Sequence, residues 1–395
     1  MSQMNAPPPI YLDAFATTPI APEALVSLTE QLRRPGNAHS PHAAGAWAAG
    51  AVERARRAVG QLIGADPQEI VFTSGATEAN NLAILGLARA AAAGGSLRRT
   101  IITSSIEHPS VLGPAAALES EGFRHLKAPV KRDGRLDLRA LRALLNEDVL
   151  FVAVMAANNI TGVLQPVAEI ARMARETGAL VHVDAAQATG KVPLDVSAWE
   201  VDSLSISGHK LYGPPGIGAL FLASTSPFVP LPIVYGGGQE RALRSGTLPA
   251  ALIAGLGAAV EVALRRMDED AIRLRAMEVR FCDALAARQV RYQLNGSAEY
   301  RLPGAMNLAI PGVAADHLVE SLSRRIAFST GSACASGHIS IAPTLKSMSI
   351  PDAIARSSMR IYFNRYSDER DADRAAEAIA EAVLKQPLAP GGVVQ

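Results

Sequence analysis

Short apolar runs alternate with helix-type patterns through the first part of the 395-residue chain. The chain reads "EIVFTSG" before "ATEANNLAILGLARAAAAG", "RTIITSS" before "SVLGPAAALESEG", and "LFVAVMAAN" before "VAEIARMARETG", and continues with "ALVHVDAA", "VDSLSISG" and "GIGALFLAS". Short runs of β-branched and apolar residues separated by helices are typical of βαβ units. Because such strands are buried on both faces, the pattern predicts a mainly parallel sheet in an α/β domain.

From about Ala251 the alternation gives way to one long helix pattern, which runs through "RRMDEDAIRLRAMEVRFCDALAARQ". Mixed strands and helices follow, and the last pattern, "DERDADRAAEAIAEAVL", is that of a charged amphipathic helix. A chain of this length exceeds one ordinary core. We therefore predict a large α/β domain followed by a smaller α+β domain.

Charge and cysteine content exclude several classes of protein. The formal net charge is +1 and acidic and basic residues are mixed along the chain, so we expect no direct nucleic-acid binding and no membrane partner. The first residues, "MSQMNAPPPI", lack the features of a signal peptide, and no apolar stretch is long enough to span a bilayer. Two cysteines, Cys282 and Cys334, cannot build a framework of several disulfides, which favours a reducing, cytoplasmic location. Cys282 lies in the long helix pattern and is expected to be buried there.

The segment that follows "EIVF" can bind an anion. In open α/β sheets, ligands bind beyond the carboxyl ends of the strands. Here a strand runs into Gly75, Ala76 and Thr77 at the start of a helix, where free backbone N–H groups and a hydroxyl can surround a phosphate. The alternative is an ordinary helix start, in which a hydroxyl residue and Glu78 form a capping box.

Two further strand ends carry titratable side chains. His108 follows "RTIITSSIE", and Asp184 ends the buried run "ALVHVD" with Gln187 three residues later. A buried carboxylate is costly without a cationic partner, so Asp184 needs either a ligand cation or an internal lysine or arginine. A lone histidine at a strand end also has a purely structural interpretation.

Lys210 follows the run "VDSLSISG", together with Ser207 and His209, and precedes a Gly-Pro-Pro-Gly turn. Between two buried strands a lysine is desolvated, which lowers its pKa and makes the amine available as a nucleophile. A surface lysine in a hairpin is the alternative. An amine for a Schiff base, a buried carboxylate for a pyridinium nitrogen and an anion site for a phosphate together indicate pyridoxal 5'-phosphate as the cofactor. No metal site is expected.

The chain also resembles a known family in a series of motifs that cover roughly residues 10 to 385. These motifs are "YLDAFATTP", "FTSGATEANN", "EHPSVL", "NNITGVLQP", "HVDAAQATGK", "SISGHKLYGPPGIG", "GGGQERALRSGT" and "STGSACAS". They resemble cysteine desulfurases of the nitrogen-fixation and iron–sulfur-cluster type, in the class V aminotransferase family. The resemblance implies the type I fold of pyridoxal-phosphate-dependent transferases, which has a mainly parallel seven-stranded sheet. It also implies a large cofactor-binding domain over residues 16–258 and a small domain formed by residues 1–15 and 259–395.

The same resemblance implies a role for each matched residue. Lys210 would bind the cofactor covalently and move protons at the substrate Cα, and His108 would stack on the ring as an acid and base. The remaining cofactor contacts would come from Asp184, Gln187, Ala76, Thr77, Asn159, Ser207 and His209. Thr247 would bind the phosphate in the partner subunit, so a homodimer is implied. Arg360, with Asn159, would bind the substrate carboxylate.

Cys334, in "STGSACASG", matches the family's nucleophile. The implied reaction removes sulfur from L-cysteine, leaves a persulfide on Cys334 and releases L-alanine, and the sulfur then passes to an acceptor protein. Glycine and serine around the cysteine predict a mobile segment that carries the thiol between the site and the acceptor. Where the family usually reads Asn-Asn-Glu, this chain has Asn158-Asn159-Ile160.

Two other functions remain open at this point. One is a selenocysteine lyase or another class V enzyme that uses the same cofactor. The other, of a different class, is a catalytically silent subunit with this fold that acts as a partner protein.

Overall fold

The computed structural model describes residues 8–331 and 341–385. Its largest feature is a seven-stranded sheet with the strand order β2-β8-β7-β6-β5-β3-β4. The strands are β2 (Ile70–Thr73), β3 (Thr100–Ser104), β4 (Arg124–Ala128), β5 (Val149–Met155), β6 (Leu180–Asp184), β7 (Ser203–Ser207) and β8 (Gly218–Leu222). Strand β8 is antiparallel to both of its neighbours, β2 and β7, and all other neighbouring pairs in the sheet are parallel. The predicted α/β fold with a mainly parallel seven-stranded sheet is therefore confirmed.

Strand β4 has no counterpart among the apolar runs of the sequence. It forms the edge of the sheet beside β3, and most of its residues are exposed or only partly buried. An edge strand with one solvated side carries polar residues such as Arg124 and Lys127. It therefore lacks the continuous apolar run that identifies a buried strand in the sequence.

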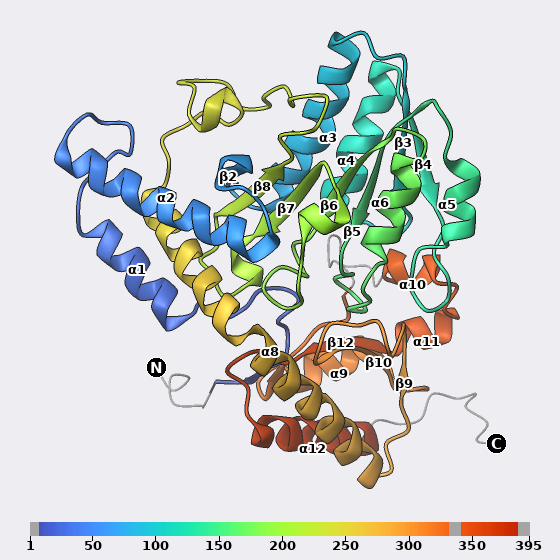
Figure 1. Cartoon of the computed structure of the whole chain (residues 1–395). Coiled ribbons are helices and arrows are strands. Elements are labelled where there is room, and N and C mark those ends of the chain that lie inside the picture. Colours follow the sequence, from blue (N-terminus) through green and yellow to red (C-terminus); the bar gives the residue numbers. More distant parts are fainter. Residues whose placement is uncertain (1–7, 332–340, 386–395) are drawn as a thin grey trace.

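Helices cover both faces of the sheet (Figure 1). Alternate residues of β5 show this division, because Val152 and Val154 belong to the main core whereas Phe151 and Ala153 pack in a second core with α3 and α4. The helices of this region are α1 (Pro22–Leu32), α2 (Ala43–Ile63), α3 (Ala76–Ala93), α4 (Pro109–Ala117), α5 (Leu138–Leu144), α6 (Val167–Arg175) and α7 (Val196–Trp199). Short 3-10 turns occur at Pro67–Glu69, Leu118–Glu121, Gly208–Lys210 and Glu240–Ala242.

Helix α8 (Ala250–Ala287) connects the sheet to a second, smaller region (Figure 1). Its first part packs on α1 and α2, and its last part packs on α12. The smaller region has a core of its own, built on the antiparallel order β12-β10-β9 and the parallel pair β1-β11. Its elements are β1 (Ile10–Tyr11), β9 (Gln293–Leu294), β10 (Ala305–Ala309), α9 (Ala315–Leu322), β11 (Ile326–Ala327), α10 (Pro343–Ser347), α11 (Asp352–Arg356), β12 (Ser358–Tyr362) and α12 (Glu369–Lys385). Helix α8 runs without a break through residue 258, where the boundary between the two domains is predicted. The predicted domain bounds therefore stay a prediction.

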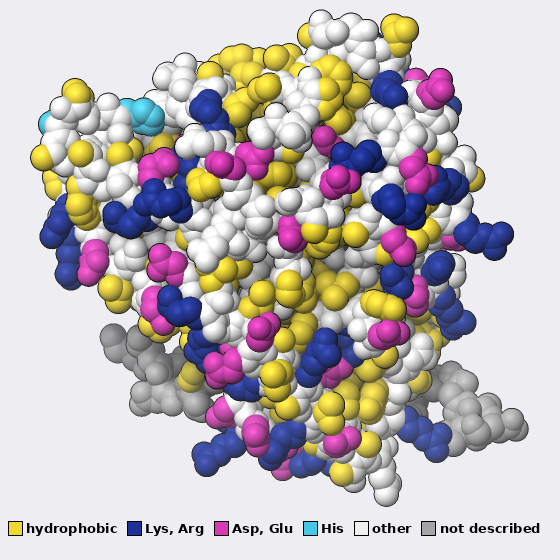
Figure 2. Space-filling model, in the orientation of Figure 1, with side chains coloured by type: hydrophobic (Ala, Val, Ile, Leu, Met, Phe, Trp, Pro, Cys, Tyr) yellow, Lys and Arg dark blue, Asp and Glu magenta, His cyan; other side chains and the backbone are white. Residues whose placement is uncertain are grey.

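Cys282 lies on α8 as predicted, but it is only partly buried, against the core of the smaller region. Acidic and basic side chains are interspersed over the face of the molecule shown in Figure 2. None of the helices in the described ranges is both long and apolar enough to cross a membrane.

The parallel strands bring their carboxyl ends to one edge of the sheet, and this edge faces the smaller region. The site described next lies there. Gly218 on β8 lies against Gly75, the residue before α3, so closely that a Cβ on Gly218 would stand 2.6 Å from the Gly75 Cα. Gly75 itself has φ +152°, a conformation that favours glycine. This close approach sets the position of the helix start relative to the sheet.

Candidate active site

A cavity of about 510 Å³ lies beyond the carboxyl ends of the strands, between the sheet and residues of the smaller region. Ten of the predicted site residues line it: Ala76, Thr77, His108, Asn159, Asp184, Gln187, Ser207, His209, Lys210 and Arg360. Segments far apart in the sequence therefore meet at one place. Thr247 is exposed and is not part of this lining, and Cys334 lies outside the described residues.

One end of the cavity is formed by the start of α3. The helix begins at Ala76, and no side chain caps its first turn at Gly75. Glu78 accepts a hydrogen bond from the backbone N–H of Ser74 at 2.8 Å and pairs with Arg244 at 2.7 Å, which lowers the pKa of its partly buried carboxyl against the effect of burial. The reciprocal capping box that the sequence left open is therefore not formed, and the first N–H groups of an 18-residue helix remain available to an anion.

Ser207, the last residue of β7, and His209, in the turn that follows, also line the cavity. The imidazole Nδ1 of His209 lies 3.0 Å from the Thr17 hydroxyl. Burial, with the charge of Lys210 and then Lys191 acting in the same direction, lowers the pKa of His209 to about 4. At neutral pH the residue is therefore a neutral imidazole in the cavity lining.

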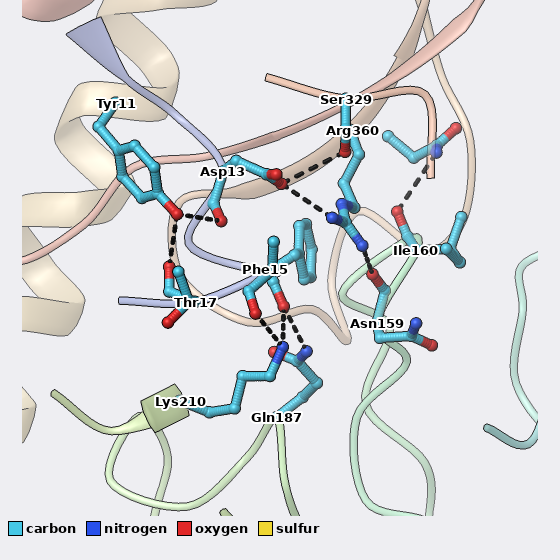
Figure 3. A network of polar contacts seen from close by, with 12 residues as sticks. Tyr11, Asp13, Phe15, Thr17, Asn159, Ile160, Gln187, Lys210, Ser329 and Arg360 are labelled. Atoms are coloured by element: carbon cyan, nitrogen blue, oxygen red, sulfur yellow. Dashed lines mark hydrogen bonds and ion pairs between the residues drawn. The ribbon is translucent and has the colours of Figure 1, made fainter. Parts of the chain in front are cut away.

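Lys210 extends into the cavity from the turn that follows β7 (Figure 3). Its ammonium donates hydrogen bonds to the backbone carbonyl oxygens of Phe15 and, at 2.6 Å, of Ala16. The pKa of Lys210 is lowered to about 8, chiefly by burial and also by the charge of Arg360, while Asp13 and Asp184 oppose the shift. The sequence-based expectation of a desolvated lysine agrees with this geometry, and the surface-lysine alternative does not.

We expect the cofactor-free protein to react with pyridoxal phosphate in a way that follows the ionisation of Lys210. Only the neutral amine is a nucleophile, so the rate of formation of the lysine-bound absorbance band should rise ~tenfold per pH unit below the pKa and level off above about pH 8. Stopped-flow mixing across this range measures the profile, with a free lysine derivative as the reference for the cofactor's own titration.

Arg360→Met provides the matched variant, because it removes a cation that lowers this pKa. Its profile should level off at a higher pH than that of the wild type. A wild-type profile that is still rising near the ordinary pKa of lysine, about 10.4, would contradict the assignment.

Asp184 ends β6 and is 6% exposed. Its Oδ1 accepts a hydrogen bond from the Ala186 N–H at 2.9 Å, and its Oδ2 accepts one from the Asn80 amide at 2.9 Å. Both donors are neutral, and no lysine or arginine within residues 8–331 and 341–385 forms an ion pair with this carboxylate. The cationic partner that burial requires can thus come from a ligand in the cavity.

His108 caps α4 and reaches into the cavity beside Asp184. Its Nδ1 accepts a hydrogen bond from the Ser110 N–H at 3.1 Å and lies 2.8 Å from the Ser110 hydroxyl. Partial burial lowers the pKa of His108, Asp184 acts in the opposite direction, and Lys210 lowers the pKa again. These contacts leave Nε2 as the nitrogen that carries the proton of the neutral ring.

Glu107, the neighbour of His108, is buried behind the site. Its Oε1 accepts hydrogen bonds from the Ser104 hydroxyl and, at 2.9 Å, from the Met155 N–H, whereas Oε2 has no partner among the described residues. Burial is the main reason that the pKa of Glu107 is raised to about 8, and Asp184 adds to the shift. Glu107 is therefore protonated at neutral pH.

This shift predicts a pH dependence of stability. Because the folded-state pKa is the higher one, the contribution of Glu107 is complete below about pH 4.5 and is lost as the pH rises to about 8. The stability of the wild type relative to Glu107→Gln should fall across this window by up to ~1.4 kcal/mol per pH unit. Melting temperatures of the two proteins at several pH values test this, with the exposed Glu381→Gln as control. A difference that does not change with pH would refute it.

Arg360, on β12 of the smaller region, also lines the cavity (Figure 3). Its Nη2 pairs with Asp13 at 2.9 Å and its Nη1 donates to the Asn159 carbonyl at 3.1 Å. Its Nε is buried and has no hydrogen-bond partner within the described ranges. A buried guanidinium with an unused donor is suited to bind a carboxylate.

Gln187 also lines the cavity. Its Nε2 donates to the Phe15 carbonyl at 2.9 Å, and its Oε1 accepts from Lys191 at 3.3 Å. The Phe15 carbonyl oxygen thus accepts hydrogen bonds from both Gln187 and Lys210 (Figure 3). One amide hydrogen of Gln187 remains for a ligand.

Ile160 replaces the family's usual glutamate without disturbing the local turn. The Asn158 side-chain oxygen accepts from the N–H groups of Ile160 and Thr161, at 2.9 and 3.0 Å. The Ile160 side chain is buried and lies against Gly331, where a Cβ would stand 2.9 Å from its Cδ1. The substitution therefore adds an apolar contact and leaves Asn159 in the cavity lining.

Four site groups were not identified from the sequence. Asn80 and Ser110 are buried within helical patterns, and Asp13 lies in a short N-terminal segment whose side-chain role depends on the distant Arg360. The fourth is the Phe15 carbonyl, a backbone group that side-chain patterns do not indicate. Asp13, Asn80 and Ser110 each lie in one of the motifs that carry the family resemblance, but a motif does not indicate which side chains meet in the fold.

Comparisons with known proteins identify the family. The family described as "Aminotransferase class-V" matches residues 10–375. Cysteine desulfurase IscS of Rickettsia felis is 41% identical over 386 residues, which cover 97% of this chain and 93% of that protein. A solved structure described as a NifS-like protein superimposes with a TM-score of 0.87 at 32% identity, covering 95% of this chain and 99% of that one.

A second solved structure, described as SspA in complex with cysteine, has a TM-score of 0.76 at 33% identity and covers 91% of this chain and 99% of that one. The matched region contains the sheet, the cavity and the smaller region. The chain therefore belongs to the class-V aminotransferase family and, within it, to the cysteine desulfurases.

Proposed function

We propose that this protein removes sulfur from L-cysteine with the help of pyridoxal phosphate, releases L-alanine and holds the sulfur as a persulfide on Cys334. The observation that carries the proposal is the cavity in which Lys210, Asp184 and Arg360 meet. An amine with a pKa of about 8, a buried carboxylate and a buried guanidinium in one pocket match an amino-acid substrate and this cofactor.

The residues fit pyridoxal phosphate at each of its functional groups. The uncapped start of α3, with Thr77, Ser207 and His209, would hold the phosphate, and Lys210 would bind the aldehyde carbon. Asp184 would pair with the pyridine nitrogen, Gln187 would donate to the phenolic oxygen, and His108 would lie against the ring. When bound there, the cofactor supplies an electron sink conjugated to the substrate Cα.

Arg360 orients the substrate. Its free Nε–H and the second hydrogens of its Nη groups would donate hydrogen bonds to the carboxylate of L-cysteine. Asp13 and the Asn159 carbonyl hold the guanidinium in place. This arrangement selects α-amino acids, because an amine without the carboxylate leaves the buried Nε–H of Arg360 without a hydrogen-bond acceptor.

Lys210 and His108 move protons. As an amine with a lowered pKa, Lys210 can take the proton from the substrate Cα and return it. His108, neutral with its proton on Nε2, would exchange a proton with the substrate thiol or with the thiol of the nucleophile.

Cys334 would act as the nucleophile toward the substrate sulfur. Its thiolate forms an S–S bond as the Cβ–S bond of the substrate breaks, and the electron pair of the broken bond remains on the carbon. A proton then completes the methyl group of L-alanine, so L-cysteine and the enzyme thiol become L-alanine and the enzyme persulfide. Because a free thiol is mostly protonated at neutral pH, a neighbouring base such as His108 would assist.

The assembly and partners are parts of the same proposal. The exposed position of Thr247, outside its own cavity lining, is compatible with a homodimer in which it reaches the partner's cofactor phosphate. A separate protein would accept the sulfur, and the cytoplasmic location expected from the sequence stays a prediction.

The proposal is tested by incubating the purified holoenzyme with L-cysteine and measuring L-alanine and transferable sulfur. We expect equal amounts of both. L-selenocysteine in place of L-cysteine distinguishes a selenocysteine lyase, which would release alanine from the selenium substrate alone. No alanine from either substrate would favour the catalytically silent subunit.

A further inference from the structure

A continuous chain of buried hydrogen bonds runs behind the site from β7 to His108. It begins at the Ser203 hydroxyl, 2.9 Å from Nδ1 of His182, and His182 Nε2 lies 2.9 Å from Oδ1 of Asn80. The Asn80 Nδ2 then donates to Asp184 Oδ2 and to the Ser110 hydroxyl, both at 2.9 Å. Asn80 and Ser203 are completely buried, and His182 is 1% exposed.

The acceptors at the site end determine the direction of this chain. An ionised carboxylate can only accept hydrogen bonds, so the side of the Asn80 amide that faces Asp184 must be the NH2 group. The amide oxygen then faces His182, and Nε2 of His182 must carry a proton to meet it. The remaining nitrogen, Nδ1, accepts from the Ser203 hydroxyl.

The same reasoning extends to His108. Because the Ser110 oxygen accepts from Asn80, its own hydrogen is available to Nδ1 of His108 at 2.8 Å, beside the Ser110 backbone N–H. Every donor in the chain thus points toward the cavity. Both site groups, Asp184 and His108, receive hydrogen bonds from behind and face the cavity with their remaining atoms.

We infer that Asn80 and His182 are positioning residues that hold Asp184 as an ionised acceptor directed into the cavity, through a hydrogen-bond chain of one fixed direction. The chemistry requires this, since Asp184 can keep a pyridine nitrogen protonated only while it remains an anion. Burial lowers the pKa of His182 to about 3, which keeps that ring neutral in the chain. The inference rests on the proposed function in one respect, namely that Asp184 pairs with the cofactor.

The first test needs neither cofactor nor activity. Nitrogen-15 NMR of histidine-labelled, cofactor-free protein reports which ring nitrogen of His182 is protonated, with His182→Gln used to assign the signal. We expect a neutral ring with the proton on Nε2 across the stable pH range. A proton on Nδ1, or an ordinary titration near pH ~6.5, would overturn the inference.

The second test compares His182→Phe with His182→Gln. Glutamine keeps an N–H donor at the position of Nε2, whereas phenylalanine fills the same space without one. Binding of pyridoxal phosphate to the cofactor-free protein should weaken ~tenfold or more in His182→Phe and in Asn80→Leu. Each substitution removes a hydrogen bond from the chain that positions the Asp184 carboxylate. His182→Gln should stay within ~threefold of the wild type.

Matched controls separate positioning from loss of buried packing. His125 bonds to Thr103 at 2.9 Å on the far edge of the sheet, and Asn295 is a buried amide in the smaller region. His125→Phe and Asn295→Leu should leave cofactor affinity unchanged even where they lower the melting temperature. Equal affinity in His182→Phe and His182→Gln would refute the positioning role.

These outcomes are distinguishable from failure of the proposed function. A wild type that shows the expected His182 tautomer and binds the cofactor but releases no alanine would disprove the function and leave the inference intact. If His182→Phe does not fold, the wild-type tautomer and the Asn80→Leu affinity still decide the question.

Discussion

Lys210→Ala is expected to abolish alanine release from L-cysteine completely. The side chain is the one amine that extends into the described cavity, and burial lowers its pKa to about 8, so both covalent attachment of the cofactor and proton transfer at Cα depend on it. Loss of a covalent catalyst that also moves the proton should reduce the rate by ~10⁴-fold or more. Alanine formation by purified protein, followed by amino-acid analysis, measures the loss.

Two observations distinguish a chemical effect from a folding effect. Lys210→Ala should bind pyridoxal phosphate without forming the lysine-bound absorbance band, since the phosphate end of the cavity is unchanged. Lys127→Ala, on the exposed edge strand β4, is a matched lysine variant that should keep full activity. Measurable turnover in Lys210→Ala at more than ~1% of the wild-type rate would contradict the assigned role.

Cys334→Ala is expected to eliminate sulfur transfer while leaving the cofactor site intact. The resemblance of its motif predicts this residue as the nucleophile, and the other cysteine, Cys282, lies on α8, partly buried against the core of the smaller region and outside the described cavity lining. Cofactor absorbance and its change on adding L-cysteine should be retained. Persulfide formation and sulfur transfer should fall below detection, and radiolabelled sulfur from L-cysteine measures both.

Cys282→Ala is the matched control. Its partly buried thiol has a pKa raised chiefly by burial, which makes it a poor nucleophile at neutral pH. Wild-type sulfur transfer in Cys282→Ala and none in Cys334→Ala would support the assignment. Normal transfer in Cys334→Ala would show that the sulfur takes another route.

The sequence was sufficient to predict the groups that follow buried strands. Lys210, Asp184 and His108 each come directly after an apolar run, and parallel strands bring their ends together, so the rule for α/β sheets placed them at one edge. The order of strands in the sheet was not predictable, because β8 enters between β2 and β7 by contacts distant in sequence. Strand β4 was missed since its exposed side carries charged residues.

Other groups depend on contacts that a linear pattern does not contain. Asn80 looks like any polar residue of a helix until α3 packs on β6 and brings it 2.9 Å from Asp184. The Phe15 carbonyl becomes a partner of Lys210 only because the N-terminal segment crosses from β1 to the sheet edge. Thr247 and Cys334 were named from the resemblance alone, and their roles stay predictions.

The most direct test of the proposed sulfur transfer follows the sulfur atom of L-cysteine to the enzyme. The holoenzyme is mixed with a limited amount of L-cysteine, quenched, and digested, and mass spectrometry then examines the peptide that contains Cys334 while L-alanine is measured in the same sample. We expect this peptide to gain one sulfur atom for each L-alanine released, and we expect neither product in Lys210→Ala. Alanine without added sulfur on Cys334, or added sulfur on Cys282 in its place, would contradict it.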